Sequence, residues 1–128
     1  MLETMHETTA RHAEIFDAAL ALNSVGGDSE FLAEVVGLIR AAWPTLLADI
    51  RRALAMGDLR AVERTARLAK AAARNVSAKR AYDSAAQLET LVGLRDLPAA
   101  QRASTSLEKE VEKLQVVLST VENSVCSS

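Results

Sequence analysis

Aromatic residues are scarce in this chain, and their scarcity restricts how its core can be built. Phe, Trp and Tyr make up 3% of the 128 residues, whereas hydrophobic residues as a whole make up 49%. A core without many large rings has to be assembled from small aliphatic side chains, which suit closely packed helices better than sheets. Charged residues make up 25%, as expected for one compact, ordered domain. The composition therefore predicts an all-α protein.

The residues that most often bind metals or act as nucleophiles are also few. Cys126 is the only cysteine, so no internal disulfide can form. His6 and His12 are the only histidines, and their six-residue spacing is poor for one helical face. The carboxylates are scattered and show no spacing typical of a ligand set. We therefore expect no metal ion, no cofactor and no enzymatic activity.

Signals for membranes and for nucleotide phosphates are missing as well. No run approaches the roughly 18 consecutive apolar residues of a membrane span, and residues 1–11 lack the apolar core of a secretion signal. Gly26 and Gly27 are adjacent, but no Gly-Lys-Ser/Thr sequence follows them, which argues against a phosphate-binding loop. We expect a tight turn at these glycines, and a soluble cytoplasmic protein that does not contact a membrane.

Apolar residues recur in steps of three and four along most of the chain, which is the pattern of amphipathic helices. The pattern predicts one short helix and four long ones, over residues 10–22, 28–56, 58–78, 79–92 and 96–122. Asp28, Asp58 and Asp96 can each cap the helix that follows. Pro44 predicts either a kink or a junction between two helices within residues 28–56.

The connections between the predicted helices are only a few residues long, so sequential neighbours should be antiparallel. The expected fold is an antiparallel up-down-up-down four-helix bundle with a short additional N-terminal helix. Residues 10–122 form this domain, between a flexible N-terminus at 1–9 and a flexible tail at 123–128. We expect a monomer.

The helix predicted over residues 58–78 carries most of the positive charge. Residues 51–80 hold nine of the fifteen Lys and Arg, and only two acidic residues. One face of this helix is apolar, with Leu59, Val62, Ala66, Ala69, Ala73 and Val76. The opposite face carries Arg60, Arg64, Arg67, Lys70 and Arg74. Such a basic face attracts acidic partners, although an ordinary solvated face is the alternative.

Three stretches in order give the chain a resemblance to a known family. They are Val25-Gly26-Gly27-Asp28, then Ala53 to Leu59, then Ala66 to Ala78. Together they resemble histidine-containing phosphotransfer (HPt) domains over roughly residues 14–118. The third stretch of that family typically reads Ala-His-x-Leu-Lys-Gly-x-Ala-x-Asn-x-Gly-Ala. The matching positions here are Ala66, Lys70, Ala73, Asn75 and Ala78, and the later landmarks are Leu88-Glu89, Asp96-Leu97 and Leu107-Glu108.

The resemblance places Arg67 where the family has the histidine that carries the phosphoryl group. A guanidinium group stays protonated and has no free lone pair, so it cannot accept and return phosphoryl. Two family glycines are also replaced, by Ala71 and Ser77. The resemblance thus implies a degenerate HPt domain that docks on a receiver domain or a histidine kinase as inhibitor, decoy or adaptor. Its expected partner-binding residues are Arg60, Arg64, Arg67, Leu68, Lys70, Ala71 and Arg74.

Two other functions remain open from the residues. The chain could be an active phosphotransfer protein that uses His6 or His12, although neither has a Lys three residues later. It could also be a basic helical module that binds nucleic acid through the Lys and Arg of residues 51–80. The acidic remainder of the chain and the absence of interleaved aromatic residues argue against nucleic acid.

Overall fold

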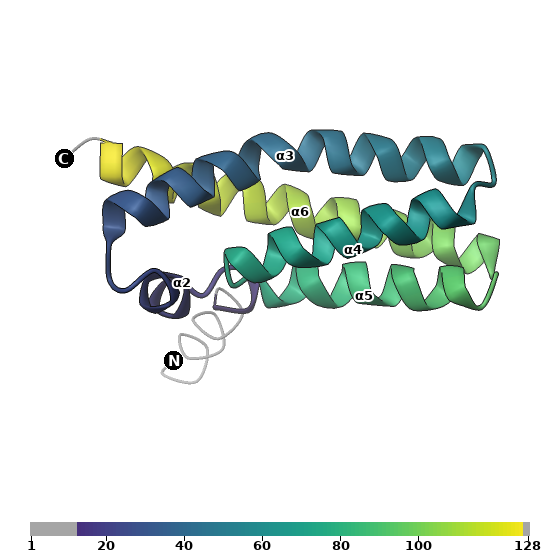
Figure 1. The fold of residues 1–128 in the computed structure, drawn as a ribbon, viewed down its shortest axis with the longest axis horizontal. Helices are drawn as coiled ribbons and strands as arrows, with labels where there is room; N and C mark the ends of the chain where they lie inside the picture. The colour runs from purple at the N-terminus through teal and green to yellow at the C-terminus, as the bar shows by residue number, and fades with distance from the viewer. Residues whose placement is uncertain (1–12, 127–128) are drawn as a thin grey trace, which may run out of the picture.

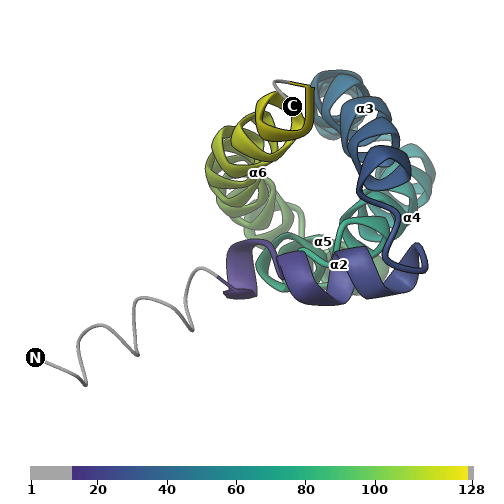
Figure 2. The ribbon, with the colours of Figure 1, turned by 90° about the vertical axis from the view of Figure 1, so that its left-hand side faces the viewer.

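The computed structural model describes residues 13–126, and all regular secondary structure in this range is helical. The helices are α2 (Ala18–Ser24), α3 (Ser29–Ala55), α4 (Leu59–Asn75), α5 (Lys79–Gly93) and α6 (Leu97–Cys126). A helical turn at residues 13–15 precedes α2. Helices α3 to α6 lie side by side along the long axis of the molecule (Figure 1), and α2 crosses one end of them (Figure 2). The predicted helical bundle with a short N-terminal helix is confirmed.

The four long helices pack around one core in the order of the chain. Helix α3 contacts α4, α4 contacts α5, α5 contacts α6, and α6 closes the ring against α3. The helices α3 and α6 have 27 and 30 residues, whereas α4 and α5 have 17 and 15. Because of this difference, α3 and α6 extend beyond the other pair at the end where α2 lies (Figure 1).

Small side chains make up much of the buried face of α4 and part of that of α5, as the shortage of aromatic residues predicts. Ala66, Ala69 and Ala73 of α4 are fully buried, and Ala85 of α5 is buried with them. Trp43 on α3 is the large exception, and it too is fully buried. The apolar face predicted for α4 is thus confirmed, and its opposite face is turned away from the core.

The helix starts agree with the predicted caps. The side chains of Asp28, Asp58 and Asp96 each accept a hydrogen bond of 3.1 Å from the backbone N–H three residues later. The predicted turn at Gly26 and Gly27 is also present, with φ angles of 70° and 81° that residues with a Cβ rarely adopt. The caps and the turn could be predicted from the sequence because each depends on residues that are close together in the chain.

Two predicted helices differ from the structure at their ends. The helix expected over residues 10–22 is interrupted at Phe16 and Asp17, because Phe16 is buried in the core and Asp17 caps α2 through the N–H of Leu20. Helix α4 ends at Asn75 and not near Ala78, because Ser77 takes a left-handed φ of 54°. The backbone N–H of Asp17 donates to the carbonyl of Ser77 at 3.0 Å, which joins these two irregular segments.

The other differences concern α3 and α6. Helix α3 continues through Pro44, so the alternative of two helices meeting there is wrong. Helix α6 reaches Cys126 and enters the segment 123–128 that was expected to be a flexible tail. The expectations for residues 1–9, His6 and His12 concern positions outside the described residues.

Helix α3 is also unusually apolar for a helix of this length. One 18-residue window within it has a mean hydropathy of 1.5, so by length and composition alone it could cross a membrane. The expectation above concerned consecutive apolar residues, a different criterion, and it stands because no such run in the sequence approaches 18 residues. A mostly buried core helix of a soluble protein meets the same criterion. In this bundle 17% of the window is buried, and α3 buries Val36, Trp43 and Ile50 completely.

Candidate functional site

The partner-binding residues predicted from the sequence all lie on α4, on the side away from the core. We call this set the α4 surface: Arg60, Arg64, Arg67, Leu68, Lys70, Ala71 and Arg74. All of them are exposed except Lys70, which is partly buried. Among the side chains that the structure describes, Arg60 and Arg64 have no ion-pair partner, whereas Arg67 and Lys70 have carboxylate partners.

The carboxylate of Glu89 on α5 lies between Arg67 and Lys70. Its Oε1 is 3.7 Å from Nε of Arg67, and its Oε2 is 3.2 Å from Nζ of Lys70. A second carboxylate, that of Glu63, accepts a hydrogen bond of 2.6 Å from Nη2 of Arg67 within α4. Two cations and two carboxylates therefore form one network across the α4–α5 contact.

The two cations of this network differ in how firmly they are held. The side chain of Arg67 is 64% exposed, and exposed ion pairs stabilise a protein by only about 0–1 kcal/mol. The side chains of Lys70 and Glu89 are 26% and 24% exposed, so water screens their interaction less. Arg67 can therefore leave its intramolecular partners at little cost, while Lys70 stays in place.

Tyr82 of α5 fixes the C-terminal end of the α4 surface. Its hydroxyl oxygen accepts a hydrogen bond of 3.0 Å from Nη2 of Arg74, whose Cζ lies 5.3 Å from the ring centroid. Nζ of Lys70 lies 5.7 Å from the same centroid. Both distances are within the range of cation–π attraction. The ring thus contacts two basic residues of α4, one helical turn apart.

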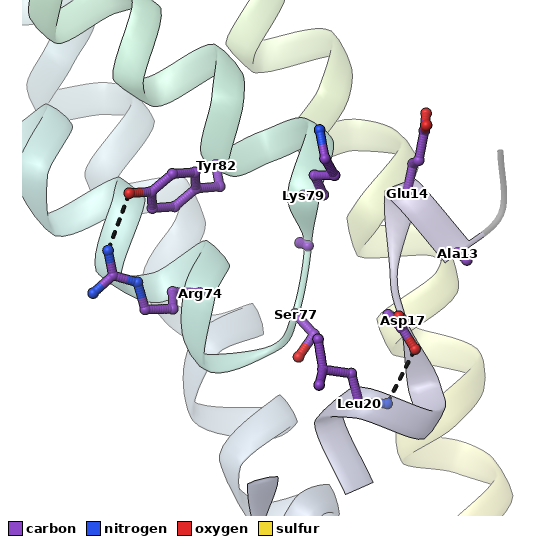
Figure 3. A pocket seen from close by; sticks show the side chains of 9 residues that line it. Ala13, Glu14, Asp17, Leu20, Arg74, Ser77, Lys79 and Tyr82 are labelled. Carbon is purple, nitrogen blue, oxygen red and sulfur yellow. Dashed lines mark hydrogen bonds between the residues drawn. The ribbon is translucent and has the colours of Figure 1, made fainter. Parts of the chain in front are cut away.

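A groove of about 420 Å³ adjoins this end of α4 (Figure 3). One wall comes from the chain before and within α2, and the other from the end of α4, the α4–α5 turn and the start of α5. Its lining consists of Ala13, Glu14, Asp17, Leu20, Arg74, Ser77, Ala78, Lys79 and Tyr82. Carboxylates lie on the first wall and cations on the second, so the groove carries charges of both signs.

Lys79, at the mouth of this groove, has its own partner. Its Nζ donates a hydrogen bond of 2.9 Å to Asp83, one turn along α5. That hydrogen bond, together with the negative charges of Asp83 and Glu14, raises the pKa of Lys79 above its ordinary value of 10.5. Lys79 is therefore charged at any physiological pH.

The contribution of Glu89 to the site was not evident from the sequence, where it is only one half of a family landmark. It is 22 residues from Arg67 and on another helix, so no helical spacing links the two residues. Only the antiparallel packing of α4 against α5 brings them together. Within residues 13–126, no group of three or more His, Cys, Asp or Glu is arranged to hold a metal ion.

Comparison with known proteins then identifies the bundle. The family model of the Hpt domain matches residues 34–116, a segment that includes all of α4 and α5. The chain belongs to the Hpt domain family. A crystal structure of the HPT domain from a sensor hybrid histidine kinase of Shewanella has the same fold, with a TM-score of 0.77 at 14% sequence identity. That alignment covers 87% of this chain and 96% of the Shewanella domain. No curated protein sequence matches the chain.

Membership of the HPt family places the chain in two-component phosphorelay signalling. HPt domains are carriers of phosphoryl groups and not catalysts, and they interact with receiver domains and histidine kinases. The α4 surface lies inside the segment that the family model matches.

Proposed function

We propose that this HPt domain docks on a receiver domain, or on a histidine kinase, without carrying a phosphoryl group. It acts as an inhibitor, decoy or adaptor in bacterial two-component signalling, in the cytoplasm and as a monomer. One observation carries the proposal: the segment matched by the family model, residues 34–116, contains no histidine. Both histidines of the chain, His6 and His12, precede that segment.

The resemblance to the family motif that begins at Ala66 supports the same proposal, because it places Arg67 at the position of the family's histidine. A phosphoryl acceptor needs a lone pair on nitrogen, which a neutral imidazole has and a guanidinium group lacks. The fork of donors on Arg67 is instead suited to carboxylates. A receiver active site contains a cluster of acidic residues, so Arg67 would enter that cluster as a counter-ion.

The apolar residues of the α4 surface make docking favourable beyond charge pairing. Exposed ion pairs add only about 0–1 kcal/mol each, too little for a specific complex. Leu68, one residue after Arg67, is 55% exposed, and Ala71 is exposed one turn further along α4. Their burial against a partner would supply the hydrophobic part of the interface, with the basic residues around it.

Two measurements on the full chain test this function. In the first, binding to a panel of isolated receiver domains is measured by isothermal titration calorimetry for the wild type and for Arg67→Glu. We expect micromolar binding to at least one receiver and a loss of about tenfold or more on charge reversal. Arg102→Glu is the matched control, because Arg102 is an exposed arginine on α6, away from α4.

In the second measurement, the chain is incubated with a radiolabelled phosphorylated receiver. We expect no label on the chain. Stable, acid-labile label that disappears in a His12→Ala or His6→Ala variant would contradict the proposal and would indicate an active phosphotransfer protein. Binding to DNA in place of every receiver, with a steep dependence on salt, would also contradict it.

A further inference from the structure

We propose that α3 contains a hinge at Pro44, and that two side chains of α6, those of Gln115 and Glu122, hold this hinge closed. The inference goes beyond the proposed function, because it concerns a movement within the domain and not its partner. In a continuous α-helix, the carbonyl oxygen of Arg40 would accept a hydrogen bond from the backbone N–H of residue 44. Proline has no N–H, so the main chain of α3 lacks this hydrogen bond.

Helix α6 supplies the donor that α3 lacks. Nε2 of Gln115 donates a hydrogen bond of 3.0 Å to the carbonyl oxygen of Arg40, the same oxygen that Pro44 deprives of its helical donor. A buried carbonyl group is costly to leave unpaired, so this side-chain amide stabilises the continuous course of α3. Without Gln115, α3 would be free to bend at this point, as helices commonly do at an internal proline.

An ion pair holds the same stretch of α3 against α6. Nη1 of Arg40 lies 2.5 Å from Oε2 of Glu122, and both side chains are partly exposed. Gly37 lies three residues before Arg40, and a Cβ at its position would be 3.2 Å from Oε1 of Glu122. The glycine therefore leaves room for the carboxylate beside α3. Because α6 makes both contacts through side chains, they can open and form again while the backbone of α6 stays helical.

The closed arrangement leaves a polar atom unpaired on each of the two helices. Nε of Arg40 and Oε1 of Gln115 are buried and have no hydrogen-bond partner among the residues that the structure describes. Both atoms would meet water if the helices separated here. Opening would thus offset part of the free energy that is lost with the two contacts, which brings the open state closer in free energy to the closed one.

The hinge separates two parts of α3 that differ in their surroundings. Because α3 has 27 residues and α4 only 17, the first turns of α3 extend beyond α4 (Figure 1). Trp43, next to Pro44, is fully buried and anchors the remainder of α3 in the four-helix section. The segment that moves is residues 29–40. Leu32 and Val36 are buried within it, so the closed state is the major one.

Hydrogen exchange of the full chain, followed by mass spectrometry, tests the hinge. Pro44→Ala restores the N–H that α3 lacks. It should slow the exchange of residues 29–40 about fivefold, which is the change that one hydrogen bond makes in an opening equilibrium. The exchange of α4 should change much less, because α4 lies outside the moving segment.

A double-mutant cycle tests whether Gln115 replaces the missing donor. Gln115→Met keeps the length of the side chain but lacks the amide N–H, so it should speed the exchange of residues 29–40 about fivefold. In the Pro44→Ala background the carbonyl of Arg40 has a backbone donor, and Gln115→Met should have little effect. Gln101→Met, at an exposed position on α6, is the matched control and should change the exchange in neither background.

Glu122→Ala breaks the ion pair and not the hydrogen bond, so it should speed the exchange of residues 29–40 in both backgrounds. Circular dichroism and urea unfolding establish that each variant is folded. An equal effect of Gln115→Met in both backgrounds overturns the proposal, because Gln115 would then act independently of Pro44. Unchanged exchange in Pro44→Ala overturns it as well. Changes of equal size in α4 and in residues 29–40 would also overturn it, since the bundle would then open as one unit.

Discussion

Arg74 on α4 donates a hydrogen bond of 3.0 Å to the hydroxyl of Tyr82 on α5 while its guanidinium lies 5.3 Å from the same ring. Arg74 lies in the last turn of its helix, where a positive charge is also favoured by the helix dipole. This one contact therefore joins the end of the α4 surface to α5, close to the turn at which the chain reverses.

Two substitutions of Tyr82 can separate the contribution of the hydrogen bond to stability from the contribution of the ring. Tyr82→Phe removes the hydrogen bond but keeps the ring, so the free energy of unfolding should fall by only about 0.5–1.5 kcal/mol. Tyr82→Ala also removes the ring beside Lys70 and Arg74, so the free energy of unfolding should fall by clearly more than in Tyr82→Phe. Urea denaturation followed by circular dichroism measures both values. Equal losses in the two variants would mean that the ring contributes nothing.

The small buried side chains of α4 should not tolerate enlargement. Ala69 is fully buried, and Ala69→Leu should destabilise the bundle by about 1–3 kcal/mol or more, because the helices cannot move apart without opening the core. Ala71→Leu, two residues later on the exposed side of α4, is the matched control and should leave stability within about 0.5 kcal/mol. The urea concentrations at the unfolding midpoints of the two variants are compared, and similar midpoints would refute the close packing around Ala69.

The start of α4 depends on the cap formed by Asp58. Asp58→Ala removes the acceptor of the Ala61 N–H and should lower the free energy of unfolding by about 0.5–2 kcal/mol. Asn is as good a cap as Asp, so Asp58→Asn should recover most of the loss. If Asn and Ala behave alike, the capping hydrogen bond is not the source of the effect.

The hydrogen bond from Lys79 to Asp83 should be visible in a titration. It raises the pKa of Lys79 above 10.5, so any stability that it contributes is fully present below pH 10.5 and is lost as the pH rises through the higher folded-state pKa. In Asp83→Asn, the pKa of Lys79 measured by NMR should fall back toward 10.5. An unchanged pKa would assign the shift to another group.

Leu68 offers a test of the interface that is independent of charge. Leu68→Ser should weaken receiver binding about tenfold or more, since it removes apolar area that a partner would bury. Its side chain is 55% exposed in the free protein, so the free energy of unfolding should change little. Leu94→Ser, at an exposed position in the α5–α6 turn, is the control for loss of an exposed leucine.

Local patterns in the sequence were enough to predict most of the fold. The apolar spacing of α4 identified its buried face, and the Asp caps identified three helix starts, because both signals involve residues within one or two turns. The end of α4 was predicted three residues late, since its last turn is closed by Ser77 in a conformation that glycine usually takes. No rule of spacing anticipates a left-handed serine.

The candidate site was only half predictable for a related reason. The basic residues of α4 share one helix, so their common surface followed from the helical period. Glu89 and Tyr82 belong to α5, and their positions beside Arg67, Lys70 and Arg74 depend on the depth and register of packing between two helices. The sequence does not encode that register in any local spacing, because the two helices meet only in the folded bundle.

The unequal lengths of the four helices have a consequence for how the molecule opens. The first turns of α3 and the last turns of α6 lack α4 and α5 beside them, so their amide protons should exchange with deuterium sooner than those of the four-helix section (Figure 1). Opening that begins at this end can proceed for several turns before it reaches Arg67. The amide protons around Arg67, in the four-helix section, should therefore exchange later than those at this end of the bundle.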